Sequence, residues 1–225
     1  MKGLENGDKS ENFGGGFCDS GFCCNSLRAT IITINLTAEV TQVDDISGLL
    51  EGNVNVGDTI TGSYTYDSTT PDSNPSETVG DYRYFSAPYG VTLSAGGFVF
   101  KTDPSSVYFC VEVGNNHLYQ TWDHYLFRSY NNLTLSNGVL VDVIDWQLYD
   151  DSGTALLSDE LPTTPPILEQ WQSYVYGLRI TYGDRGYSSI SADVTSAVPE
   201  PGTVFLLGLG CLVLSRKRKF AAVRS

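Results

Sequence analysis

The sequence predicts an all-β fold: an antiparallel β-sandwich of the jelly-roll type, followed by a single C-terminal hydrophobic helix. Apolar residues alternate with polar residues along several runs of the chain, and glycine-rich turns separate these runs. An uncharged apolar run near the C-terminus predicts the helix. No long stretch before it has the 3.6-residue period of an amphipathic helix, so many short strands are the simplest interpretation.

The strands are expected where the alternation has period two. In the first run Ile32, Ile34 and Leu36 are separated by Thr33 and Asn35. The runs with this pattern are 32–40, 59–66, 107–113, 139–149 and 174–182. In the fourth, the apolar phase changes between residues 143 and 144, which predicts a β-bulge. Short helical turns are expected only at 46–51 and 162–170, and long polar connections at 67–81 and 157–166.

The chain is expected to have three parts. Residues 1–28 are glycine-rich and charged and contain no apolar block, which predicts a disordered leader or a start that does not belong to the exported protein. Residues 29–196 are long enough to form one β-domain with its own core. Cys110 is the only cysteine of that domain, so the domain has no disulfide framework. Residues 197–225 form a tail.

The charge distribution separates the tail from the rest. The chain has 13 basic and 26 acidic residues, a net charge of −13. Five of the basic residues follow the apolar run, and no acidic residue does. Without those five positive charges, the net charge of −13 becomes −18 for residues 1–215. A body of that charge repels phosphate backbones, so nucleic acid is excluded as a partner.

The tail has the composition of a membrane-retained segment. Val198, Pro199, Glu200 and Pro201 form an extended, helix-breaking start. Residues 202–215 carry no charge and would reach about 21 Å as a helix, against about 30 Å for the hydrocarbon core of a bilayer. The basic residues that follow would lie on the cytoplasmic side and place the body outside. They are Arg216, Lys217, Arg218 and Lys219. A buried core helix is the alternative for a run of this length.

These three parts, in this order at the terminus, resemble the PEP-CTERM sorting signal. In that family the signal is associated with exosortase, a membrane-embedded processing enzyme of Gram-negative bacteria that make extracellular polysaccharide. The resemblance implies export, retention at the cell membrane through the C-terminal helix, and then cleavage. Delivery to the cell surface or to the extracellular, biofilm-type matrix would follow. A membrane-anchored domain that is never cleaved is the alternative. The family shares the tail and no common activity.

One loop is a candidate calcium site, although the sequence demands no cofactor. Carboxylates at high density can supply the oxygen ligands that calcium prefers. Those of this loop are Asp67, Asp72, Glu77 and Asp81. The ligand spacing of an EF-hand is absent, and a solvated turn is the alternative interpretation.

Aromatic residues supply the second candidate site. The chain has 14 tyrosines and three tryptophans, and Trp122 with Tyr125 is the expected face for stacking on sugar rings. Core packing is the alternative role of such residues. The two histidines, His117 and His124, are seven residues apart and would lie on opposite faces of one continuous strand.

The sequence therefore favours a structural or adhesive protein that binds polysaccharide and is not an enzyme. It contains no nucleophile elbow, phosphate-binding loop or zinc-protease motif. A secreted carbohydrate-active enzyme is the alternative, because the two carboxylates of a glycosidase need not be adjacent in sequence.

Overall fold

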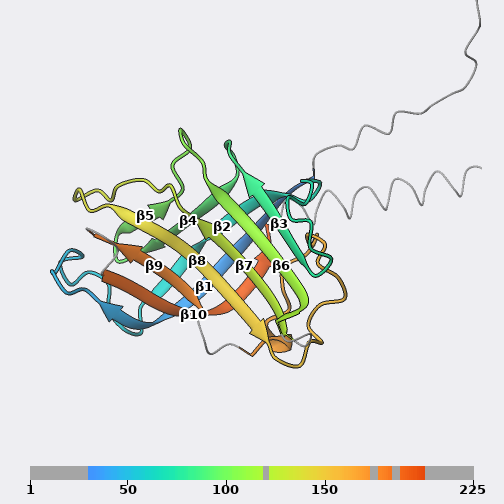
Figure 1. The fold of residues 1–225 in the computed structure, drawn as a ribbon. Helices are drawn as coiled ribbons and strands as arrows, with labels where there is room; N and C mark the ends of the chain where they lie inside the picture. The colour runs from blue at the N-terminus through green and yellow to red at the C-terminus, as the bar shows by residue number, and fades with distance from the viewer. Residues whose placement is uncertain (1–29, 119–121, 173–176, 184–187, 201–225) are drawn as a thin grey trace, which may run out of the picture.

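A computed structural model describes residues 30–118, 122–172, 177–183 and 188–200 of the chain. Within them the chain forms ten strands and one short 3₁₀ helix, η1 (Leu168–Gln170) (Figure 1). The strands are β1 (Ile31–Asp44), β2 (Thr59–Asp67), β3 (Val79–Tyr84), β4 (Gly90–Ala95), β5 (Phe98–Lys101), β6 (Phe109–Leu118), β7 (Trp122–Ser129), β8 (Val141–Asp150), β9 (Leu178–Tyr182) and β10 (Ser188–Pro199).

All ten strands belong to one antiparallel sheet, in the order β3-β6-β7-β8-β9-β10-β1-β2-β4-β5. The predicted all-β antiparallel fold is confirmed. The predicted sandwich of two sheets is replaced by one continuous sheet that curls into a half-barrel (Figure 1). Alternation along a strand shows which face is buried, but it does not show whether two buried faces belong to one sheet or to two.

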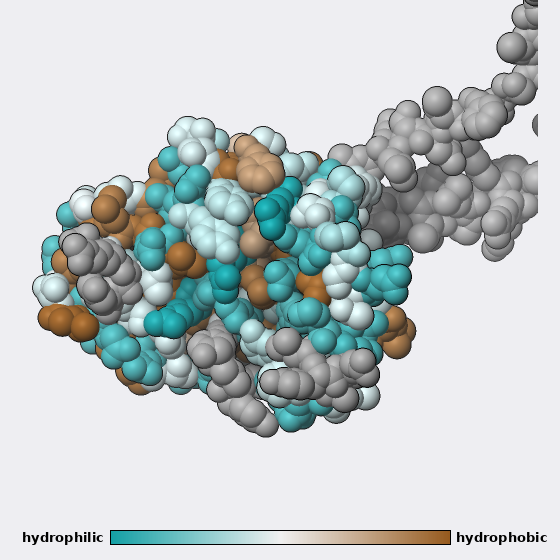
Figure 2. Space-filling model, viewed as in Figure 1, coloured by the Kyte–Doolittle hydropathy of each residue, from teal (hydrophilic) through white to brown (hydrophobic). Residues whose placement is uncertain are grey.

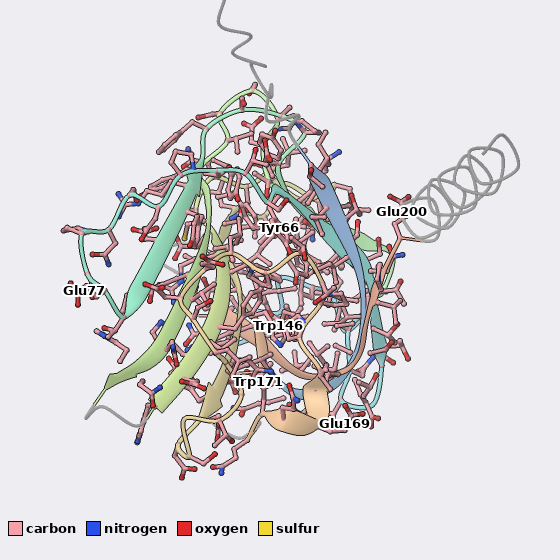
Figure 3. All side chains as sticks on the ribbon, turned by 90° about the vertical axis from the view of Figure 1, so that its right-hand side faces the viewer. Tyr66, Glu77, Trp146, Glu169, Trp171 and Glu200 are labelled. Atoms are coloured by element: carbon pink, nitrogen blue, oxygen red, sulfur yellow. The ribbon has the colours of Figure 1, made fainter. Side chains whose placement is uncertain are left out.

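The core fills the concave side of the curled sheet. Tyr64 of β2 lies 4.6 Å from Phe127 of β7 and 6.1 Å from Trp146 of β8, measured between ring centroids. These strands are far apart in the sheet order, so the curl brings the two halves of the sheet face to face. Figure 3 shows Tyr66 and Trp146 inside, between the two walls of strands. The Tyr64 and Tyr125 hydroxyls meet there at 3.0 Å.

The predicted bulge in the fourth run is confirmed. The pairing of β8 with β9 shifts register between Val141 and Val143, and the intervening Asp142 is exposed. The extra residue reconciles the two apolar phases, because Val141 and Ile144 are both buried although they are three positions apart. The bulge thus turns a carboxylate outward near the start of the strand.

Loop residues bind backbone groups at one place on each edge of the sheet. On β3, the backbone N–H of Asp81 donates to Asp72 Oδ1 at 2.8 Å, and Asp81 O accepts from Ser73 N at 2.9 Å. Beyond β5, Leu133 N donates to Lys101 O at 2.8 Å, and Asp103 N donates to Asn131 O at 2.9 Å. The second pair of bonds ties the end of β5 to the segment that follows β7.

Several sequence predictions fall outside the described residues. They are the leader 1–28, the apolar helix 202–215 and the basic cluster 216–219. Among the residues that the structure does describe, no helix is both long enough and apolar enough to cross a membrane.

Candidate functional site

Three aromatic side chains form an exposed ladder across three adjacent strands. Phe85 follows β3, Tyr108 precedes β6 and Tyr130 follows β7, so each extends its strand by one residue. The rings of Phe85 and Tyr108 are stacked with centroids 5.7 Å apart, and those of Tyr108 and Tyr130 are 4.7 Å apart. Phe85 is 67% exposed and Tyr130 38% exposed. We call these three residues the aromatic ladder.

The backbone fixes the spacing of this ladder. Tyr130 N donates to Tyr108 O at 3.0 Å, which continues the β6–β7 hydrogen bonding beyond the strand ends. Neighbouring strands lie about 4.8 Å apart, so three aromatic residues in register present about 10 Å of ring surface. Hydrophilic side chains cover most of the surface that Figure 2 presents. Within the ladder the rings of Phe85 and Tyr130 are exposed, and that of Tyr108 is half-buried between them.

Paired charges flank the ladder. Arg128 Nη2 donates to Asp145 Oδ2 at 3.2 Å, and its guanidinium carbon lies 5.9 Å from the centre of the Tyr130 ring. Burial alone would lower the pKa of Arg128, but Tyr130 and Asp145 raise it. Burial raises the pKa of Asp145 in spite of this arginine. On the β3 side, Arg83 Nε donates to Asp81 Oδ2 at 2.8 Å. Neither arginine therefore offers an unpaired positive charge.

A pocket of about 420 Å³ adjoins Tyr130. Its polar lining comes from Asp103, Asn131, Asn132 and Asp142. Both amides are held in place, because Asn131 Nδ2 donates to Ser106 O at 2.9 Å and Asn132 Nδ2 donates to Asp142 O at 3.1 Å.

The two carboxylates of the pocket differ in whether they already accept hydrogen bonds. Asp103 Oδ1 accepts bonds from the hydroxyl and the N–H of Ser105, which lower the pKa of Asp103. Asp142 is the bulge residue of β8, and within the described residues its carboxylate makes no hydrogen bond. A bulge is a known way to re-aim a side chain, and here it leaves an acceptor available at the pocket.

The predicted sugar-stacking residues are not brought together. Trp122 is 37% exposed and begins β7, at the opposite end of that strand from Tyr130. Tyr125 is fully buried on the concave side, where its hydroxyl meets that of Tyr64. Residues three apart on a strand point to opposite faces, so these two cannot form one binding surface. The aromatic ladder was missed because its residues become neighbours only through strand register.

Three of the four carboxylates proposed as calcium ligands already accept hydrogen bonds from neighbouring groups. Asp67 Oδ1 accepts from Thr69 N at 2.9 Å, and the bonds from Thr69 lower the pKa of Asp67 although burial opposes this. Asp72 binds the edge of β3, and Asp81 pairs with Arg83. Glu77 is exposed and points away from the domain in Figure 3. Among the described residues, no group of three or more His, Cys, Asp or Glu side chains is placed to hold a metal ion.

The two histidines lie on neighbouring strands, not on one. His117 of β6 and His124 of β7 have ring centroids 5.7 Å apart, because the chain turns back between them. His124 Nε2 lies 2.8 Å from Glu112 Oε1, and this contact lowers the pKa of Glu112. Opposite faces were expected only if one continuous strand carried both histidines, and that condition is not met, because a turn separates them.

The sorting motif begins inside the sheet. Val198 and Pro199 end β10 and pair with Asn35 and Ile34 of β1, and Glu200 follows directly. Glu200 lies at the margin of the domain in Figure 3. Pro201 and the four basic residues Arg216, Lys217, Arg218 and Lys219 lie outside the described residues.

Comparisons with known proteins bear on this terminus alone. No curated protein and no solved structure matches the chain. Residues 197–219 match the PEP-CTERM protein-sorting motif, 23 residues that run from the last part of β10 to the end of the basic cluster. The motif implies processing by exosortase and delivery to the cell surface or beyond it. The chain therefore carries a C-terminal PEP-CTERM sorting motif.

Proposed function

We propose that this protein is a surface or extracellular-matrix protein that binds polysaccharide, in a structural or adhesive role and without turnover. The sorting motif supports the location. The observation that carries the binding role is the aromatic ladder of Phe85, Tyr108 and Tyr130 beside a polar pocket.

This arrangement suits the chemistry of a sugar chain. A pyranose has apolar C–H faces, which pack on aromatic rings, and a rim of hydroxyl groups, which need donors and acceptors. The ladder supplies the rings, and the amides and carboxylates of the pocket supply the polar partners. The pocket volume of about 420 Å³ lies within the range of about 300–1,000 Å³ typical of small-ligand sites.

The charges favour a neutral polysaccharide. Asp103 and Asp142 line the pocket, and the flanking Arg83 and Arg128 are already paired with carboxylates. A uronic acid or sulfated sugar would bring a negative charge to a site with no unpaired cation among its lining residues. A neutral glycan avoids this repulsion.

The test is calorimetric titration of the secreted protein with neutral and acidic polysaccharides purified from the producing cells. Tyr108→Ala and Tyr130→Ala are expected to weaken binding about 10- to 30-fold, since a central aromatic contact contributes about 2 kcal/mol. Trp122→Ala is the matched control, an exposed aromatic residue at the other end of the same strand, and should leave the affinity unchanged.

Two outcomes would contradict the proposal. Equal affinity of the ladder variants and the parent protein would remove the ladder from the binding site. Release of new reducing ends during the titration would show turnover and make the protein a carbohydrate-active enzyme.

A further inference from the structure

The sheet holds the first residues of the sorting motif in place. Ser196, Ala197, Val198 and Pro199 pair with consecutive residues of β1, from Thr37 back to Ile34. The pairing continues one step further, because Glu200 N donates to Thr33 O at 2.9 Å. We call residues 196–200 the terminal tab. The matched motif starts at residue 197, so four of the five tab residues belong to it.

Among the described residues, the tab is paired along one side only. Within the described residues, β9 pairs with β10 from Ser188 to Ala192 and no further. From Asp193 onward no residue of β10 is fully buried, although Val194 and Ala197 pack partly against the core. β1, in contrast, is anchored by Ile34 and Leu36, which are 0% and 3% exposed. Release of the tab thus removes the partial packing of Ala197 but exposes no fully buried residue of β10.

A β-bulge separates the tab from the rest of β10. The register shifts where Thr37 pairs with Ser196 but Ala38 pairs with Val194, which leaves Thr195 as the extra residue. A bulge interrupts the ladder of hydrogen bonds and bends the strand. The ladder is therefore interrupted two residues before the motif begins.

The position of the tab also limits how far the body stands from the membrane. The apolar run that the sequence predicts for the bilayer is 202–215, so Pro201 alone separates it from the tab. One extended residue spans about 3.5 Å, less than the headgroup layer of about 5–7 Å. A paired tab therefore leaves no length of chain between the body and the bilayer surface. Release of the five tab residues adds about 17 Å.

We propose that the terminal tab is the strand by which the processing enzyme takes hold of this protein, and that it must leave β1 to be bound. A released tab offers both backbone edges and both side-chain faces to a partner, as a peptide does when it adds to a sheet edge. The paired tab offers one edge, close to the body. The tab bends away from the sheet at Thr195. Residues Thr33–Thr37 of β1 compete with the processing enzyme for the tab. This inference rests on the sorting motif and is independent of polysaccharide binding.

The test is a cross-link that holds the tab on β1 in the full chain, expressed in cells that contain the processing enzyme. Asn35 and Val198 pair directly, and Val198 is 49% exposed. Paired residues of adjacent strands lie within the distance that a disulfide requires. The double variant Asn35→Cys with Val198→Cys is expected to be processed at least tenfold more slowly than the parent, and a reductant should restore the rate.

The matched control is a cross-link of the same two strands on the body side of the bulge. Glu39 and Asp193 pair directly and are both exposed. Glu39→Cys with Asp193→Cys should be processed at the parental rate. Mass spectrometry of the product gives the extent of processing and the last residue retained.

The inference is overturned if the tab-linked protein is processed as fast as the control, or if the parent chain is not processed. Hydrogen exchange of the parent provides an independent measurement. The amides of Ser196, Ala197, Val198 and Glu200 should exchange at least tenfold faster than those of 188–192, and equal protection of the two segments would also overturn the inference.

Discussion

At the scale of single residues, the core depends on polar atoms that only the fold brings together. Tyr64 and Tyr125 are 61 positions apart and fully buried, and each hydroxyl is the partner of the other. Burial raises the pKa of both tyrosines well above the usual value, so the pair stays neutral. The alternation around Tyr64 predicts its burial, but no local pattern predicts which hydroxyl it meets.

Removal of one hydroxyl of this pair should cost more than removal of both. Tyr125→Phe leaves the Tyr64 hydroxyl buried without a partner, which costs about 1–3 kcal/mol of unfolding free energy. Addition of Tyr64→Phe should then cost little or restore stability. Urea unfolding of the two single variants and the double variant measures the coupling, and additive losses would contradict a shared bond.

At the scale of elements, the sequence predicts strands best where one face is buried. β1 and β2 alternate cleanly and were predicted, as was the bulge of β8. β7 was not, since residues 123–127 are all buried and so carry no period of two. The aromatic ladder could not be predicted either, because it depends on the register of three strands.

The loop after β8 gives a prediction about pH. Asp150 accepts backbone bonds from Ser152, Thr154 and Ala155. Burial opposes ionisation, but these bonds and that of the Ser152 hydroxyl outweigh it and lower the pKa of Asp150 to about 2. Because the folded pKa lies below the unfolded value of 3.8, Asp150 contributes stability that is complete above about pH 4. That contribution is lost as the pH falls toward 2.

Urea unfolding of the parent and of Asp150→Asn between pH 2 and 7 checks this prediction. The variant should be less stable at neutral pH, and the difference in unfolding free energy should shrink as the pH falls from 4 to 2. A difference that stays constant over this range would show that Asp150 does not titrate abnormally.

At the scale of the whole molecule, the single curled sheet makes the fold one unit. The ends of the domain meet in the middle of the sheet, because β1 and β10 are neighbours there. A sandwich would contain two sheets that could separate, whereas here each half of the sheet continues into the other through β9, β10 and β1. The composition and the period-two alternation predicted an all-β fold. They did not predict the strand order, which makes the fold one sheet and not two.

This continuity predicts one cooperative unfolding transition. Trp146 and Trp171 are buried at 0% and 7% exposure, so tryptophan fluorescence reports on the core, and far-ultraviolet circular dichroism reports on the strands. The two signals should change at the same urea concentration. Two separate transitions would indicate that the halves of the sheet fold independently.

The loop contacts at both edges of the sheet have a consequence for association between copies of the domain. An open edge strand can recruit the same strand of another copy and start a fibril. Asp72 and Ser73 occupy the backbone groups of Asp81 on β3, and residues 131–133 occupy those at the end of β5. These bonds leave fewer backbone groups of the two edge strands available for pairing with another copy.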